Sequence, residues 1–387
     1  MNRFTDININ INISAPLLLA TIPNKIPLPV IDWQAIRQAA PKPLVIEAGQ
    51  FPQADMIVVT WTSAEWSALD HVMLNSAERR FPDDTQWRSH WFGYTDSHDI
   101  TAYTDSPDME PLFYFQLVGI DNGEGHQQRV LLVKSQAHLA HPPWITGLEA
   151  VIDILLEKSG AKKILSTGTA GGGSITDMLG AAIVTNSGHI QLEKPENSGC
   201  DYNHQTFTCK TWFPSEGLYK ATRDSLMFAM DQVWNADTIA DAIVALNQSP
   251  LTDPPIEPCD DATTYTYDDL INPPLNPDNL KQAQVKVCKN QPLLTTDYYF
   301  IEGEEPHDPY CFLEMDDAVI AHQAERAGVE YAFIRNVSDP IVVTHTASGH
   351  PIPESVRGNW SGIIYQRCGF YSSFNSVLLT WAAIAGE

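Results

Sequence analysis

Alternating runs of apolar and polar residues divide this chain into short strands and amphipathic helices. Residues 55–61 are β-branched and apolar, which predicts a buried strand, and residues 63–72 predict a helix capped by Thr62 or Ser63. Apolar residues recur at helical spacing from Trp144 to Lys158, and Gly160 marks a natural end. Further strands are predicted at 112–120, 130–134, 163–167, 181–185 and 330–336, and further helices at 312–327 and about 369–385.

This alternation of strands and helices indicates an α/β fold, with a mixed central sheet covered by helices on both faces. Patterning is weak over residues 1–54, 76–110 and 190–285, and residues 249–278 are rich in Pro, Asp and Asn. We therefore predict an N-terminal extension over 1–54 and one domain over 55–387, with a Pro/Asp-rich insertion at about 190–285.

Composition and charge exclude several classes of partner. The net charge of −25 repels nucleic acid and anionic membranes, and no Lys/Arg-rich run offsets it. No apolar run approaches the roughly 20 residues that span a bilayer. The N-terminus has one early arginine, Arg3, and an interrupted apolar stretch, so it does not predict a signal peptide. The six cysteines lack C-x-x-C spacing, which favours reduced thiols and a cytoplasmic location.

Residues 166–173 read Ser-Thr-Gly-Thr-Ala-Gly-Gly-Gly directly after a predicted strand. The stretch matches neither the dinucleotide fingerprint nor a P-loop, so a structural turn is the simpler interpretation. The other interpretation is a backbone that approaches a ligand closely.

Acidic residues follow or precede predicted elements at three places. Asp339 lies after a strand, as a turn residue or as a proton donor whose pKa burial would raise. Glu314 and Asp316 lie at a predicted helix start, as partners of the helix dipole or as acceptors for a vicinal diol. Glu65, taken alone, is predicted to be an exposed acid at a helix start. The pairs His138/His141 and His345/His350 could suggest a metal site, but the first falls on a predicted loop and lacks a carboxylate at metal spacing, so no metal site is predicted.

Taken in order, these motifs resemble the purine and uridine phosphorylase superfamily, and most of all its methylthioadenosine/S-adenosylhomocysteine nucleosidases. The resemblance covers about residues 55–187 and 285–387. It rests on Val58–Glu65, Leu131–Ser135, Ile164–Gly172, Leu294–Phe300, Glu314–Asp316 and Ile334–Asp339.

The resemblance implies a three-layer α/β/α phosphorylase/hydrolase-like fold that cleaves the N-glycosidic bond of a purine nucleoside. It implies that Asp339 protonates purine N7 as general acid, and that Glu65 activates water. By the same resemblance, Arg335 and Thr169 help to place that water. The remaining substrate contacts that it implies are Ala170, Gly171, Tyr299, Phe300, Glu314, Met315, Asp316 and Ser338. It implies no cofactor and a homo-oligomer.

The nucleophile is predicted to be water rather than phosphate. A phosphorylase needs arginines around phosphate, and the segment 55–65 contains neither Arg nor Gly. Asp316 is one methylene shorter than the Glu usual in the family, and Pro340 follows the Ser-Asp pair. A phosphate-dependent phosphorylase and a non-catalytic nucleoside-binding or transport protein stay open as alternatives.

Overall fold

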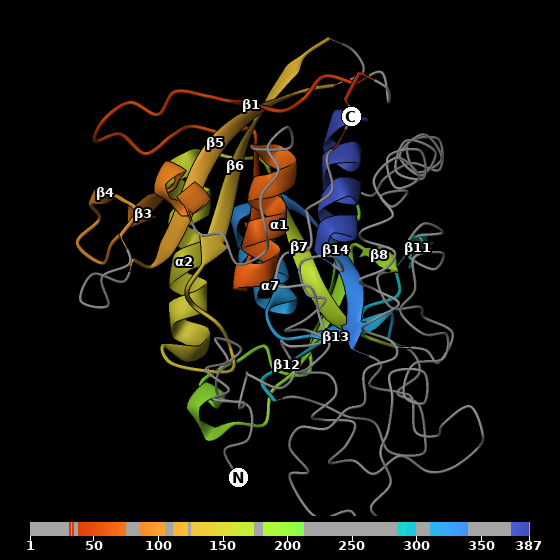
Figure 1. Cartoon of the computed structure of the whole chain (residues 1–387). Coiled ribbons are helices and arrows are strands. Elements are labelled where there is room, and N and C mark those ends of the chain that lie inside the picture. Colours follow the sequence, from red (N-terminus) through yellow and green to blue (C-terminus); the bar gives the residue numbers. More distant parts are fainter. Residues whose placement is uncertain are drawn as a thin grey trace, which may run out of the picture.

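The computed structural model describes residues 31, 33–34, 38–74, 86–104, 111–122, 125–173, 181–212, 285–288, 290–298, 310–339 and 373–386 (Figure 1). Statements below on what the structure contains refer to these residues. Tyr299, Phe300, Pro340, His345 and His350 lie outside them, as do residues 1–30 and most of the predicted insertion.

Four parallel strands form the centre of one large sheet. In spatial order they are β6 (Gln127–Ser135), β2 (Met56–Thr60), β7 (Lys163–Gly172) and β14 (Glu330–Asp339). Two neighbours run the other way: β5 (Phe113–Asp121) pairs antiparallel with β6, and β8 (Ala182–Thr185) with β14. The mixed sheet predicted from the sequence is therefore confirmed.

Shorter strands extend the sheet at both ends. Beyond β5 lie β1 (Lys42–Pro43), β3 (Phe92–Tyr94) and β4 (Ile100–Ala102). The other strands are β9 (Ser187–Gln191), β10 (Thr206–Thr208), β11 (Val285–Val287), β12 (Leu293–Thr296) and β13 (Phe312–Glu314).

Helices cover both faces of the sheet (Figure 1). The helices are α1 (Ser63–Met73), α2 (Trp144–Ser159) and α7 (Asp317–Ala327), and residues 373–385 are also helical. Successive residues of β7 point to opposite faces. The Ser166 hydroxyl donates to Asp317 of α7, whereas the Thr167 hydroxyl accepts from Thr380 of the C-terminal helical segment. The three-layer α/β/α arrangement is thus confirmed.

The predicted helix at 312–327 is wrong at its beginning. Phe312–Glu314 is strand β13, which pairs with β12 and with the end of β7, and the helix begins only at Asp317. Residues of β13 and of the first turn of α7 are both buried. The apolar positions of the strand therefore happen to continue the helical spacing upstream of the true helix start. Glu314 therefore lies at a strand end and Asp316 at the helix N-cap.

The Gly-rich stretch is not a turn. Residues 163–172 form one continuous strand, because β14 pairs with it as far as Gly171 and β13 pairs with Gly171 and Gly172. Sequence patterning also missed β3, β4, β9, β10 and β12. These strands are three to five residues long, too short to show a clear period.

The described part of the predicted extension packs on the sheet. Lys42 and Pro43 pair with β5, and the Phe51 ring lies 5.2 Å from that of Phe115. The domain boundary at residue 54 stays a prediction. No helix among the described residues is long and apolar enough to cross a membrane.

Candidate active site

The carboxyl ends of β2, β7 and β14 lie side by side, which is where ligands gather in open α/β sheets. Strand β2 ends at Thr60, and α1 begins three residues later with a capping box. The Thr62 hydroxyl accepts from the backbone N–H of Glu65 at 3.3 Å, and Glu65 accepts from the Thr62 N–H at 2.9 Å. The helix start therefore turns the Glu65 carboxylate back over the end of the sheet.

The Glu65 carboxylate is held by five donors. Oε2 accepts from the Thr60 hydroxyl at 2.8 Å, the Trp61 N–H at 3.1 Å and the Thr62 N–H. Oε1 accepts from the backbone N–H and the hydroxyl of Thr169, both at 2.7 Å. The residue is only 2% exposed, so the prediction of an exposed acid is wrong. The capping box explains the burial of Glu65, because the hydrogen bond from the Thr62 N–H holds the side chain against the end of the sheet.

Glu65 is an ionised group. Burial raises its pKa, but the Arg335 charge and the donors from Thr62 and Thr169 lower it by more, so the pKa lies below its ordinary value. At neutral pH the site therefore contains a fixed negative charge at this position.

The side chain of Arg335, on β14, extends from the neighbourhood of Glu65 to the start of α7. Its Nε donates to Asp317 Oδ2 at 2.9 Å, and Nη2 donates to Asp317 Oδ1 and to Glu314 Oε2. Nη1 donates to the Thr169 carbonyl at 3.2 Å, and the guanidinium lies 4.8 Å from the Trp61 ring centroid. Burial lowers the pKa of Arg335, but Asp317 and Glu314 raise it by more, so the group stays charged.

Glu314 connects Arg335 to the first turn of α7 through hydrogen bonds. Its Oε2 accepts from the backbone N–H groups of Asp316 at 2.6 Å and Asp317 at 2.9 Å, and its Oε1 from the Thr295 hydroxyl. Burial and the neighbouring Asp317 raise the pKa of Glu314. Because protein donors occupy both oxygens, Glu314 acts here as a support, and its direct contact with substrate stays a prediction.

Asp316 faces the loop between β6 and α2. Its Oδ1 accepts from the Leu139 N–H at 3.3 Å, and its Oδ2 lies 3.2 Å from His138 Nε2. Burial and the Glu314 charge raise the pKa of Asp316 well above its ordinary value. Burial and the neighbouring positive and imidazole groups lower the pKa of His138 well below its ordinary value, so this histidine is neutral.

Gly168 is a glycine of the central strand whose missing side chain matters at this site. A Cβ at this position would lie 2.6 Å from Glu65 Oε1 and 2.8 Å from Arg335 Nη1, which is closer than real contacts allow. The glycine thus lets a carboxylate and a guanidinium approach the backbone of β7. The sequence predicted a close backbone approach as the alternative to a turn, and here the approaching groups belong to the protein itself.

The remaining predicted residues lie around this centre. Thr169 and Met315 are partly exposed, whereas Ala170 and Gly171 are buried. Ser338 is buried, and its hydroxyl lies 3.5 Å from the Ala170 carbonyl, to which it donates. A β-bulge between Val337 and Asp339 sets the Asp339 backbone opposite Gly171, but the Asp339 side chain is outside the described part of the structure.

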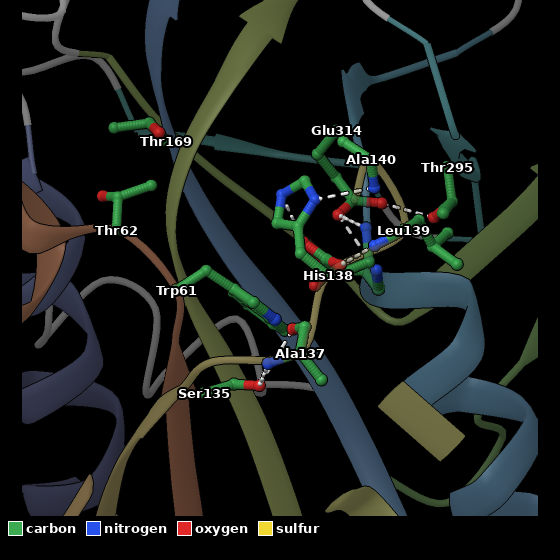
Figure 2. Close-up of polar contacts among 12 residues, drawn as sticks. Trp61, Thr62, Ser135, Ala137, His138, Leu139, Ala140, Thr169, Thr295 and Glu314 are labelled. Atoms are coloured by element: carbon green, nitrogen blue, oxygen red, sulfur yellow. Dashed lines mark hydrogen bonds and ion pairs between the residues drawn. The ribbon is translucent and has the colours of Figure 1, made fainter. Parts of the chain in front are cut away.

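Figure 2 shows Thr62 and Thr169 together on one side of this region, with His138, Ala140, Glu314 and Thr295 on the other. The structure thus places Thr169 in contact with both Glu65 and Arg335, and it links Arg335 to Glu314 and, through Glu314, to Asp316. Sequence patterning missed the five polar or aromatic residues that hold these groups: Thr60, Trp61, His138, Thr295 and Asp317. Sequence patterning presents His138 only as a candidate metal ligand. Its position three residues after β6, at the same sheet edge as the acids, was a usable signal.

The described residues contain no group of three His, Cys, Asp or Glu side chains arranged to hold a metal ion. What the site does contain is several buried carboxyl groups around one guanidinium. Such a constellation can accept hydrogen bonds from hydroxyl groups and can stabilise positive charge that develops on a bound molecule.

No family model matches the sequence, and no curated protein matches it. Comparison with solved structures finds similar chains. They include the 5′-methylthioadenosine/S-adenosylhomocysteine nucleosidase from Neisseria meningitidis with methylthio-immucillin-A (11% identity, 85% of this chain and 98% of that chain, TM-score 0.44). Futalosine hydrolase of Helicobacter pylori (10%, 85% and 96%, 0.45) and the S-adenosylhomocysteine nucleosidase from Streptococcus pyogenes (12%, 87% and 98%, 0.45) are also similar. Each residue's role is argued below from its own contacts in this chain.

Proposed function

We propose that this protein is a purine nucleosidase, which hydrolyses the N-glycosidic bond of a purine nucleoside to free base and ribose. The observation that carries the proposal is the ionised Glu65 carboxylate, buried at the carboxyl end of the sheet and linked through Thr169 and Arg335 to the acids before α7. Glu65, Arg335 and Asp339 are the proposed catalytic residues, with Asp316 as acceptor for the ribose hydroxyls.

The charge of this centre suits the transition state. Cleavage of an N-glycoside passes through an oxocarbenium-like state, in which positive charge develops on the sugar. The ionised Glu65 carboxylate provides fixed negative charge near Arg335, whereas burial raises the pKa values of Glu314 and Asp316. Glu65 is therefore the group proposed to favour a cation at the site. Because these groups are fixed by hydrogen bonds before substrate binds, they need little reorganisation during the reaction.

Glu65 is proposed to orient water rather than to act as a strong base. Its lowered pKa makes it a weak base, and five donors fix its two oxygens. A weak base is sufficient, because an oxocarbenium-like carbon is electrophilic enough for water to attack before the proton is lost. The partly exposed Thr169, whose hydroxyl donates to Glu65, would lie beside that water.

Asp339 is proposed to donate the proton to purine N7. The base leaves more easily as a neutral purine, so general-acid catalysis at this point contributes about 10² to 10⁴ in rate. The β-bulge in β14 supports the assignment, because bulges often redirect a side chain next to a site.

Water is favoured over phosphate by the contacts of Arg335. Four of its five N–H groups already donate to protein acceptors among the described residues. An arginine that is bound by two carboxylates has little capacity left for bidentate contact with phosphate. The alternatives of a phosphorylase and a non-catalytic nucleoside-binding protein are decided by the following experiment.

The test is release of free base from a panel of purine nucleosides, measured by chromatography with and without inorganic phosphate. We expect base and free ribose in both conditions, and we expect Asp339→Asn to lower kcat by about 10² to 10⁴. Strict dependence on phosphate, with ribose 1-phosphate as product, would identify a phosphorylase. Saturable nucleoside binding without base release over hours would identify a binding protein.

A further inference from the structure

We propose that His138 is a positioning residue that orients Asp316 toward the two vicinal hydroxyls of a bound ribose. The proposal rests on the proposed function, because it names the part of that site which selects a ribosyl substrate. It assigns a role to a histidine that the resemblance does not account for.

The hydrogen bonds of His138 determine its tautomer. The backbone N–H of Ala140 donates to Nδ1 at 2.9 Å, so Nδ1 is the acceptor of the ring (Figure 2). The proton of the neutral imidazole therefore lies on Nε2, which is 3.2 Å from Asp316 Oδ2. This N–H group is the proposed donor to Asp316, and the ring is fixed by the chain segment that follows it.

The same turn supplies a backbone donor to Asp316. The Leu139 N–H donates to Oδ1 at 3.3 Å, so residues 138–139 contact both carboxylate oxygens. An ionised carboxylate has about four lone-pair sites, so at least one stays available on each oxygen. Two lone pairs on adjacent oxygens match the two hydroxyls of a vicinal diol.

The orientation of Asp316 depends on the loop between β6 and α2. Asp316 is 3% exposed and lies at the N-cap of α7 without a capping hydrogen bond from its own side chain. Its carboxylate instead contacts Leu139 and His138 of that loop. Without the Nε2–H group, Oδ2 would lose its proposed donor.

This pair gives substrate binding a defined pH dependence. Burial and Glu314 raise the pKa of Asp316, whereas hydroxyl donors bind its ionised form. Ribonucleoside binding should therefore weaken as pH falls through the raised pKa of Asp316. The other charged or titratable groups that act on the pair are Asp317, Arg335 on β14, Lys134 on β6, Lys194 and His141.

The test compares two substitutions of His138. Each retains one of the two hydrogen-bonding groups of the ring, either the acceptor at Nδ1 or the donor at Nε2. His138→Asn retains an acceptor for the Ala140 N–H and removes the donor to Asp316, whereas His138→Gln can place an amide N–H where Nε2 lies. Each variant is measured for KM by base release and for Kd by calorimetry, from pH 5 to pH 9. The ligands are a purine ribonucleoside and its 2′,3′-dideoxy analogue.

We expect His138→Asn to raise KM and Kd for the ribonucleoside roughly tenfold, as the loss of one hydrogen bond to a charged group predicts. The dideoxy analogue should be unaffected, and the acid rise in KM should move to higher pH. His138→Gln should restore most of the loss. The control is His141→Asn, which removes the ring stacked on His138 at 5.3 Å but no hydrogen bond to Asp316.

Equal effects of His138→Asn and His138→Gln, or equal effects on both ligands, would overturn the role of His138 while base release continues. If the wild-type protein binds the ribonucleoside but releases no base, the hydrolytic function fails, and the Kd values alone decide the role of His138. If the wild-type protein binds no ribonucleoside, both proposals fall.

Discussion

Gly168 is the residue on which the packing of the site depends most directly. Its missing side chain leaves room for Glu65 Oε1 and Arg335 Nη1. We expect Gly168→Ala to push both groups away from β7 and to lower kcat at least a hundredfold, because misplacement by about 1 Å has that effect on an aligned site. The free energy of unfolding should fall by about 1–3 kcal/mol from overpacking. Base release and urea denaturation measure the two effects.

Gly188 on β9 provides the matched control for this substitution. A Cβ there would meet Ala318 and Phe333 at 3.5 and 3.6 Å, which is ordinary van der Waals contact. Gly188→Ala should therefore retain activity and lose little stability. If Gly168→Ala retained wild-type kcat, the close approach of Glu65 and Arg335 to the strand would have no bearing on catalysis.

At the scale of elements, the hydrogen bonds at the start of α1 make the buried Glu65 carboxylate a stabilising charge. The folded pKa of Glu65 lies below its value of 4.5 in the unfolded chain, so its contribution to stability is present above about pH 4.5 and is lost as pH falls through the folded pKa. Glu65→Gln replaces the carboxylate by an amide, so an NH₂ group would face some of the five donors that now point at an oxygen. It should cost about 1–3 kcal/mol at neutral pH, as an unsatisfied buried polar group does.

Urea denaturation at pH 7 and at pH values below 4.5 tests this expectation. The difference between wild type and Glu65→Gln should shrink as the pH decreases. Glu157→Gln on the exposed side of α2 is the control, and we expect a change within about 0.5 kcal/mol. A difference that is constant with pH would show that the carboxylate charge is not what stabilises the start of α1.

The same elements show how far sequence patterning reaches. The strand at 55–61, the helix after it and the helix ended by Gly160 follow from local periodicity and caps, and the structure confirms them. The burial of Glu65 does not follow, because five donors from two chain segments determine it. Likewise, the strand character of 312–314 comes from pairing with β12 and β7, which no local pattern records.

At the scale of the whole molecule, pairing of distant segments assembles the site. Glu65 and Thr169 are 104 positions apart in the sequence, and His138 and Asp316 are farther apart still. The order of motifs predicted that such segments converge, and the contacts of Glu65, Thr169 and Arg335 agree with it. The roles of all the predicted site residues, those of Tyr299, Phe300 and Asp339 included, and the predicted homo-oligomer stay predictions.

The net charge of the whole molecule leads to a prediction about the choice between charged and neutral substrates. A net charge of −25 repels anions over distances that salt controls, with a Debye length of about 10 Å at 0.1 M. A purine nucleoside 5′-monophosphate should therefore have a higher KM than the neutral nucleoside at low salt, and the ratio of the two KM values should fall several-fold between about 10 and 300 mM salt. The KM of the neutral nucleoside should stay constant and serves as the internal control. If the nucleotide bound better at low salt, a local cluster of basic groups would have to outweigh the field of the whole chain.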